Sequence, residues 1–201
     1  MTTLGLEATS IRRSPSAGPA GWLAGSAIAL AVTAAAATVA PGLAHQRDHL
    51  YAWSGVAMTT ADALVLAGVV ALSRSRVVAS GWFRTLAFGL AIAGSAGIVV
   101  AEALLRMDST AANALFGVVG PMQALGLIAV GGAIAWKGAW TSWRRFPLLT
   151  MGLYIPLVMV QLVIVPSQAS GKEENLLPLA GYHLLVGLVG LAFRSEEGRV
   201  G

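Results

Sequence analysis

Two carboxylic acids lie inside stretches of the sequence that are otherwise almost uncharged. Asp62 follows Trp53 by nine residues in an apolar run, and Glu102 is the one ionisable residue between Arg84 and Arg106. Charged side chains are costly within a bilayer, so acids in such runs are expected to face protein or a watery cavity. A neutral carboxyl group in an apolar pocket can donate a proton. Asp62 and Glu102 are therefore the candidate catalytic residues.

Further polar and aromatic residues are expected to line a pocket shared with these acids. At about 1.5 Å of rise per residue, Asp62 lies roughly 13 Å below Trp53, near the midplane, and Glu102 lies near the outer end of its helix. Each polar residue also has a structural interpretation, since Glu102 could pair with Arg106 four residues on and His183 could hydrogen-bond a neighbouring helix. The candidate substrate-binding residues are Phe116, Gln123, Tyr154, Gln161, Tyr182 and His183.

Several other chemistries have no support in the sequence. His45 and His49 have the i, i+4 spacing of metal ligands, but H-Q-R-D-H lacks the glutamate of the H-E-x-x-H motif and is interpreted as a solvated turn. The absence of cysteine excludes disulfides and thiolate metal sites. Nucleotide-binding and serine-hydrolase motifs are also absent, and no basic stripe suggests nucleic acid as a partner. We expect no metal and no cofactor.

The composition is that of a membrane protein. Of the 201 residues, 56% are hydrophobic and 11% are charged, against about 25% charged residues in soluble domains. Six apolar runs are each long enough to cross a hydrocarbon core of about 30 Å. They predict an all-α polytopic protein of the cell membrane, with six transmembrane helices in one bundle. The expected spans are residues 21–44, 53–72, 84–106, 112–134, 146–165 and 176–193, between a disordered tail at 1–20 and a C-terminal tail at 195–201.

Two of the six runs carry further signals. The first run has basic residues ahead of it and small residues before His45, as a cleavable signal sequence has, but its length exceeds the usual 7 to 15 apolar residues and favours a retained helix. In the third run Gly89, Ala93 and Gly97 recur every fourth residue. Small residues at this spacing allow helices to approach closely in a membrane. The third span is therefore expected to be a central helix that packs through this face.

The distribution of basic residues predicts the orientation of the spans. Positive residues are concentrated in short cytoplasmic loops of membrane proteins. In a six-span arrangement, one side would hold only Arg47, Arg106 and Lys172. The other side would hold both termini, which places them in the cytoplasm. That side would carry ten basic residues: Arg12, Arg13, Arg74, Arg76, Arg84, Lys137, Arg144, Arg145, Arg194 and Arg199.

In size, number of spans and buried acids, the chain resembles the small integral-membrane terpene and meroterpenoid cyclases of bacteria. The resemblance covers the chain in outline and involves no short motif, and the aspartate-rich motifs of soluble terpene synthases are absent. It implies acid-initiated cyclisation of a lipophilic isoprenoid that enters from the bilayer. On this resemblance Asp62 or Glu102 would donate the proton, and Tyr182 and His183 would position the donor.

Two other functions are consistent with the same residues. In a small proton-coupled transporter or carrier, Asp62 and Glu102 would exchange protons with a cavity, and a homodimer would supply the repeat half that this short chain lacks. In a non-catalytic membrane subunit, the buried polar groups would only fix helix packing. The three hypotheses differ in which property a mutation of the acids should change: turnover, pH-dependent flux or stability.

Overall fold

The computed structural model describes residues 18–39, 49–75, 77–105, 107–137, 140–158 and 176–200. All regular structure in these ranges is helical. The described residues form six α-helices, and a 3₁₀ turn precedes α5. The elements are α1 (Pro19–Val39), α2 (His49–Arg74), α3 (Trp82–Leu105), α4 (Ser109–Lys137), η2 (Ser142–Arg145), α5 (Pro147–Tyr154) and α7 (Leu176–Val200).

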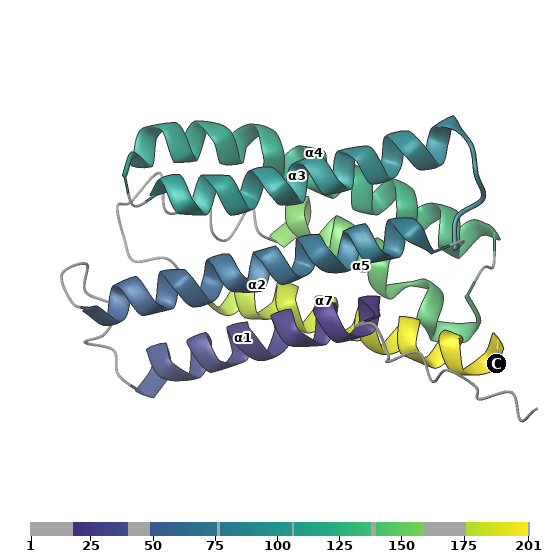
Figure 1. The fold of residues 1–201 in the computed structure, drawn as a ribbon, viewed down its shortest axis with the longest axis horizontal. Coiled ribbons are helices and arrows are strands. Elements are labelled where there is room, and N and C mark those ends of the chain that lie inside the picture. The colour runs from purple at the N-terminus through teal and green to yellow at the C-terminus, as the bar shows by residue number, and fades with distance from the viewer. Residues whose placement is uncertain are drawn as a thin grey trace, which may run out of the picture.

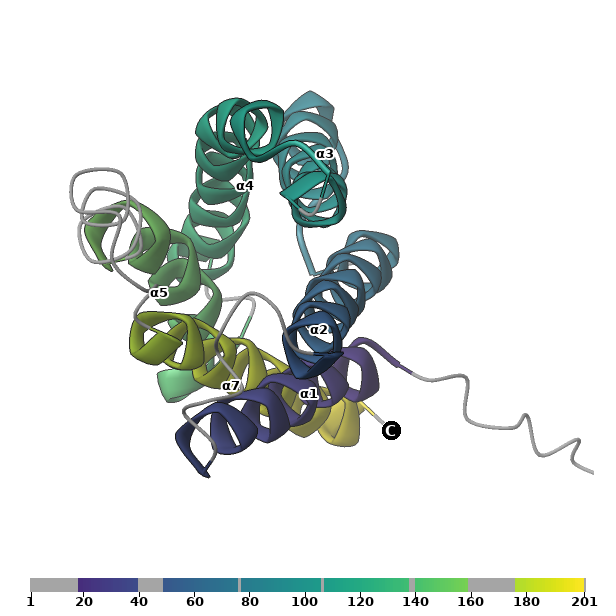
Figure 2. The ribbon, with the colours of Figure 1, turned by 90° about the vertical axis from the view of Figure 1, so that its left-hand side faces the viewer.

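The helices lie side by side along one common direction and form a bundle (Figure 1). Seen from its end, the bundle is a ring in which each helix packs on the next one in sequence (Figure 2). α7 closes the ring, because it packs on both α5 and α1. The third span is thus one member of a ring, which corrects the expectation of a central helix.

Within the described residues, three helices are long and apolar enough to cross a membrane: Gly55–Arg74 within α2, all of α3, and Thr110–Lys137 within α4. The segment Pro19–Thr33 of α1 is also apolar, and α1 continues to Val39. The expected number of six spans therefore stays a prediction. α7 continues through residues 195–200, which were expected to form a tail. Three parts of the prediction lie outside the described residues: most of the tail at 1–20, residues 40–44 of the first span and residues 159–165 of the fifth span.

Local sequence signals explain where several helices begin and bend. Asp108 caps α4, since its Oδ1 accepts hydrogen bonds at 3.0 Å from the backbone N–H groups of Thr110 and Ala111. α5 begins with Pro147, whose missing N–H is not needed in a first turn. After Tyr154 the chain continues through a wider π-helical turn at 155–158. Pro156 lies in that turn, where the loss of one backbone N–H favours a change of helix geometry.

α3 and α4 pack closely through small residues. A Cβ atom on Gly94 would lie 2.3 Å from the backbone nitrogen of Gln123, and one on Gly126 would lie 2.3 Å from that of Ala91. The backbones can approach this closely only because both positions lack a side chain. The expected face of Gly89, Ala93 and Gly97 is only partly right: Gly97 does face α4, through Val119, but a Cβ atom on Gly89 would meet nothing within 4 Å.

An ion pair joins the η2 turn to the end of α7. The Arg144 guanidinium donates a hydrogen bond of 2.9 Å from Nη1 to Oε1 of Glu196. The Thr141 hydroxyl donates to the same oxygen at 3.1 Å. The hydrogen bond from Arg144 is the main reason that the pKa of the Glu196 carboxyl lies below its usual value.

We expect this pair to contribute little to stability and to lose its contribution in acid. Because the pKa of Glu196 is lower in the folded protein, the contribution is present above the ordinary glutamate pKa of about 4.3 and disappears as the pH falls through the lower folded value. Surface pairs contribute at most about 1 kcal/mol. Glu196→Gln should therefore lower the melting temperature by about 2 to 4 °C or less at pH 7, as thermal unfolding in detergent can measure. A difference from wild type that stays the same down to about pH 3 would contradict this assignment.

Candidate functional site

The carboxyl groups of Asp62 and Glu102 lie against one another, on α2 and α3. The two side chains are within hydrogen-bonding reach. Asp62 is 7% exposed, and Glu102 is half-buried. An ionised carboxylate only accepts hydrogen bonds, so a bond between two carboxyl groups requires one of them to hold a proton. The two acids predicted from the sequence therefore form one pair that can share a proton.

His183 places a basic nitrogen beside this pair. Its Nδ1 lies 3.1 Å from the carbonyl oxygen of Leu179. Since a carbonyl only accepts, Nδ1 is assigned as the protonated nitrogen of the neutral ring. Nε2 then carries a lone pair 3.9 Å from Oδ1 of Asp62 and has no hydrogen-bond partner among the described residues. At this distance a proton could pass between the two groups after a small shift or through one water molecule.

Tyr182 and Gln123 continue the polar contacts beyond the acids. The Tyr182 ring meets the His183 ring edge to face, with the centroids 5.2 Å apart. Within the described part of the chain its buried hydroxyl has no well-aligned hydrogen bond, and the Gln123 side chain is the polar group that approaches it. Gln123 in turn donates from Nε2 to the Ser95 hydroxyl at 2.9 Å. Gln123 and Ser95 are 3% and 1% exposed, so this hydrogen bond is buried.

Four helices contribute to this polar cluster, which consists of Asp62, Ser95, Glu102, Gln123, Tyr182 and His183. α7 packs on α1 and α5, and it stands across the ring from α3 (Figure 2). The side chains of Tyr182 and His183 nevertheless reach groups on α2 and α4, so they point into the interior of the ring. The cluster therefore links α7 to α2 and α4, on which α7 does not pack.

The acid pair joins the middle of α2 to one end of α3. Asp62 is thirteen residues after the start of α2 at His49 and twelve before its end at Arg74. Glu102 is three residues before the end of α3 at Leu105, about 5 Å from that end.

A hollow of about 280 Å³ opens between α2 and α3 beside the acid pair. It is lined by Val56, Thr59, Thr60, Ala63 and Ala103, and the last two are the sequence neighbours of Asp62 and Glu102. Both threonine hydroxyls donate to carbonyls of their own helix, at 2.9 and 2.7 Å. The lining therefore presents mainly apolar groups, which suits hydrocarbon rather than a polar ligand.

Two other predicted substrate-binding residues, Tyr154 and Phe116, are not members of the cluster. The Tyr154 hydroxyl donates to the carbonyl oxygen of Pro178 at 2.9 Å and thereby joins α5 to α7. Phe116 is half-buried on α4, seven residues and about 10 Å from Gln123. Gln161 and the partner expected for Glu102, Arg106, lie outside the described residues. A role for these side chains in binding stays a prediction.

Ser95 is the member of the cluster that was not predicted. It lies seven residues before Glu102 on α3, which places both side chains on the same face of the helix. This spacing was the available signal, but serine is common in the small-residue faces of membrane helices and does not stand out there.

Within the described ranges, no group of three or more metal-ligating side chains could hold an ion. His45 lies outside these ranges, as does the side chain of His49. Comparisons with models of protein families, with curated proteins and with solved structures found no match to this chain. The polar cluster and its surroundings are therefore the features of this chain that indicate its function.

Proposed function

We propose that this protein is an integral-membrane enzyme that uses the Asp62–Glu102 pair to protonate a lipophilic substrate. The observation that carries the proposal is the contact between these two carboxyl groups inside a helical bundle. One of them must hold a proton for the contact to be favourable. A neutral carboxylic acid in apolar surroundings is a suitable donor to an alkene or an epoxide.

Acid-initiated cyclisation of a terpenoid or meroterpenoid is the reaction that this site would suit best. The carboxyl O–H adds its proton to a carbon–carbon double bond, whose π electrons form the new C–H bond and leave a carbocation. A second double bond of the substrate closes the ring, and loss of a proton to the carboxylate ends the sequence. The product is an isomer of the substrate, so the balance of the reaction requires no other reactant.

The surroundings of the pair support the later steps of this reaction. The buried Tyr182 ring can stabilise a carbocation by cation–π attraction, which is strongest where water is excluded. Nε2 of His183 can accept a proton from Asp62 or return one to it. The apolar hollow lined by Ala63 and Ala103 lies on the same two helices as the acids and suits the hydrocarbon part of a lipophilic substrate.

A proton-coupled carrier is the second candidate function. The observation that favours it is the arrangement of a proton-sharing acid pair beside an unprotonated imidazole nitrogen, 3.9 Å apart. Such groups can exchange a proton without any substrate chemistry. A carrier would show pH-dependent flux of a solute into vesicles, and this flux would be lost in Asp62→Asn.

Comparison of lipid extracts tests the enzymatic proposal. Cells that contain the protein are compared by mass spectrometry with cells that do not, with an isoprenoid quinone and a linear polyprenol supplied as probes. We expect a new compound with the mass of one probe and a different retention time. Intact protein in the membrane with no new isomer would contradict cyclisation, and pH-dependent solute flux in that case would favour a carrier.

We further propose six spans with both termini in the cytoplasm. Every lysine and arginine within the described residues lies at one end of the bundle, where α2, α4 and α7 end and α3 begins. This is the charge distribution of a cytoplasmic face. At that end of α3 lies the turn containing Ala79, and the turn containing Met107 lies at the other end.

Cysteine labelling tests this orientation, because the chain has no cysteine of its own. Ala79 and Met107 are both exposed, so either position can accept a reactive side chain. We expect a membrane-impermeant maleimide to label Met107→Cys in intact cells and Ala79→Cys only after the membrane is opened. The reverse pattern would place the termini outside the cell.

A further inference from the structure

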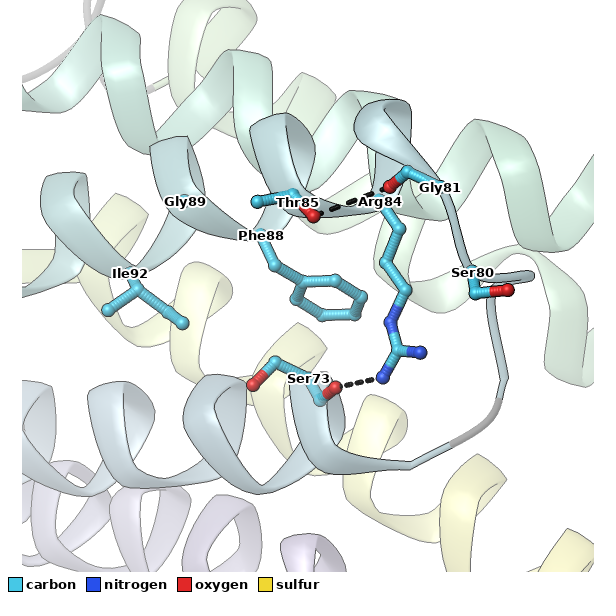
Figure 3. A pocket seen from close by; sticks show the side chains of 8 residues that line it. All are labelled: Ser73, Ser80, Gly81, Arg84, Thr85, Phe88, Gly89 and Ile92. Carbon is cyan, nitrogen blue, oxygen red and sulfur yellow. Dashed lines mark hydrogen bonds between the residues drawn. The ribbon is translucent and has the colours of Figure 1, made fainter.

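A second hollow lies at the opposite end of the same pair of helices, where α2 ends and α3 begins (Figure 3). Its volume is about 380 Å³. Gly81 makes the turn into α3 with a φ of +148°, a conformation that other residues rarely adopt. From Gly81 the lining extends along α3 as far as Ile92, a distance of about 16 Å. The hollow is thus elongated along the helix direction.

Arg84 provides a positive charge at the end of this hollow. Its side chain reaches from α3 to α2, where Nη2 donates to the backbone carbonyl of Ser73 (Figure 3). Nη2 also donates to the backbone carbonyl of Ser75 at 3.0 Å. These bonds hold the guanidinium in place and cap the end of α2. The described residues supply acceptors only to Nη2, so the N–H groups on Nε and Nη1 remain for a ligand. Arg74, at the end of α2, adds a second positive charge close by.

The rest of the hollow is apolar and open to the outside of the bundle. The Phe88 ring lies between α3 and α2, and Ile92 follows one turn further along α3 (Figure 3). Gly89 is exposed, and a Cβ atom there would meet nothing within 4 Å. These residues belong to the membrane-spanning candidate Trp82–Leu105. This part of the hollow therefore faces the hydrocarbon of the bilayer when α3 spans it.

We propose that this hollow binds a membrane lipid whose headgroup carries an anionic phosphate. The phosphate would accept hydrogen bonds from Arg84, and the first part of an acyl chain would lie against Phe88, Gly89 and Ile92. Planar N–H groups of arginine suit phosphate oxygens, and basic pockets at the ends of spans recognise anionic headgroups. A free phosphate ion would use only the charged end of the hollow, and a zwitterionic lipid would gain less from the two arginines.

This lipid site is distinct from the polar cluster. Arg84 and Glu102 are separated by 18 residues of α3, about 27 Å. Neither Arg84 nor Phe88 has a contact with the acid pair, and the two hollows share no lining residue. The proposal therefore does not depend on the reaction proposed for the acids.

Native mass spectrometry of the purified full chain in detergent tests the proposal. The probes are phosphatidylglycerol, phosphatidylcholine and inorganic phosphate, each added separately and in competition. We expect one phosphatidylglycerol to be retained at least tenfold more than phosphatidylcholine. Arg84→Gln should reduce this retention at least tenfold, since it removes the charged donor.

Gly89→Leu provides a test that does not remove the contact between Arg84 and α2. Leucine has room at this position and favours a helix over glycine, so the protein should fold while the side chain fills the hollow and displaces the lipid. The controls are Gly117→Leu, also in open space, and Arg145→Gln, whose guanidinium lies 4.8 Å from the Phe146 ring. Both should retain the lipid within twofold of wild type.

Three outcomes would overturn the proposal. The first is equal retention of phosphatidylglycerol and phosphatidylcholine, which would show that the charge is not recognised. The second is unchanged retention in folded Gly89→Leu, which would place the lipid elsewhere. The third is displacement of phosphatidylglycerol by an equal concentration of inorganic phosphate, which would identify the ligand as the free ion.

Discussion

Asp62→Asn should reduce formation of the cyclised product by about 100-fold or more. The asparagine amide has nearly the same shape and can still hydrogen-bond to Glu102, so the bundle should fold. It cannot, however, transfer an acidic proton to a double bond. Glu102→Gln should cause a loss of the same order, because the two carboxyl groups share one proton and act as a unit. Product formed per amount of folded protein in membranes measures both effects.

Asp108→Asn is the matched control for these variants. It makes the same chemical change at the cap of α4, where asparagine caps a helix about as well as aspartate, so little stability is lost. Product formation should stay within twofold of wild type. If Asp62→Asn also retains product formation within twofold, the acid pair is not the proton donor. If Asp62→Asn lowers only the amount of folded protein, the pair serves packing, as in a non-catalytic subunit.

Gly94→Val should destabilise the protein by about 3 kcal/mol or more. A Cβ atom at this position would lie 2.3 Å from the Gln123 nitrogen and 2.6 Å from its Cα atom. These are backbone atoms, which cannot turn away as a flexible side chain can, so α3 and α4 would have to separate. The separation would also move Gln123 away from Ser95 and disturb the polar cluster. Chemical denaturation in detergent, followed by circular dichroism, measures the loss.

Gly117→Val on α4 is the control for the close approach of the two helices. A Cβ atom there would meet nothing within 4 Å, so valine changes helix propensity alone. We expect a change in unfolding free energy of less than about 1 kcal/mol, and a gain is possible because glycine is a poor helix former. Equal stability of the two variants would show that α3 and α4 are not in contact at Gly94.

The sequence predicted the helices better than their contacts. Long apolar runs locate α2, α3 and α4 to within a few residues, because length and hydropathy are properties of each segment alone. The packing face of α3 could not be located in the same way. With 24 glycines in the chain, several faces carry small residues at helical spacing. The structure uses the face of Ala91 and Gly94 and leaves Gly89 open.

The acids could be singled out from the sequence, but their contact could not. Each is conspicuous as a lone charge in an apolar run, whereas their separation depends on how far α2 and α3 slide past one another. Nothing in either segment sets this register. The same applies to His183, whose ring reaches Asp62 from a helix more than 100 residues later in the chain. Ser95 was missed because its importance comes only from its bond to Gln123.

Infrared spectroscopy of the purified protein is the most direct test of the shared proton on which the proposed chemistry depends. A protonated carboxyl group has a C=O stretching band that is separate from the bands of carboxylates. At neutral pH we predict such a band in the wild type, and we predict that it is lost or shifted in both Asp62→Asn and Glu102→Gln. A spectrum without this band at neutral pH, or a band that neither substitution changes, would contradict the account.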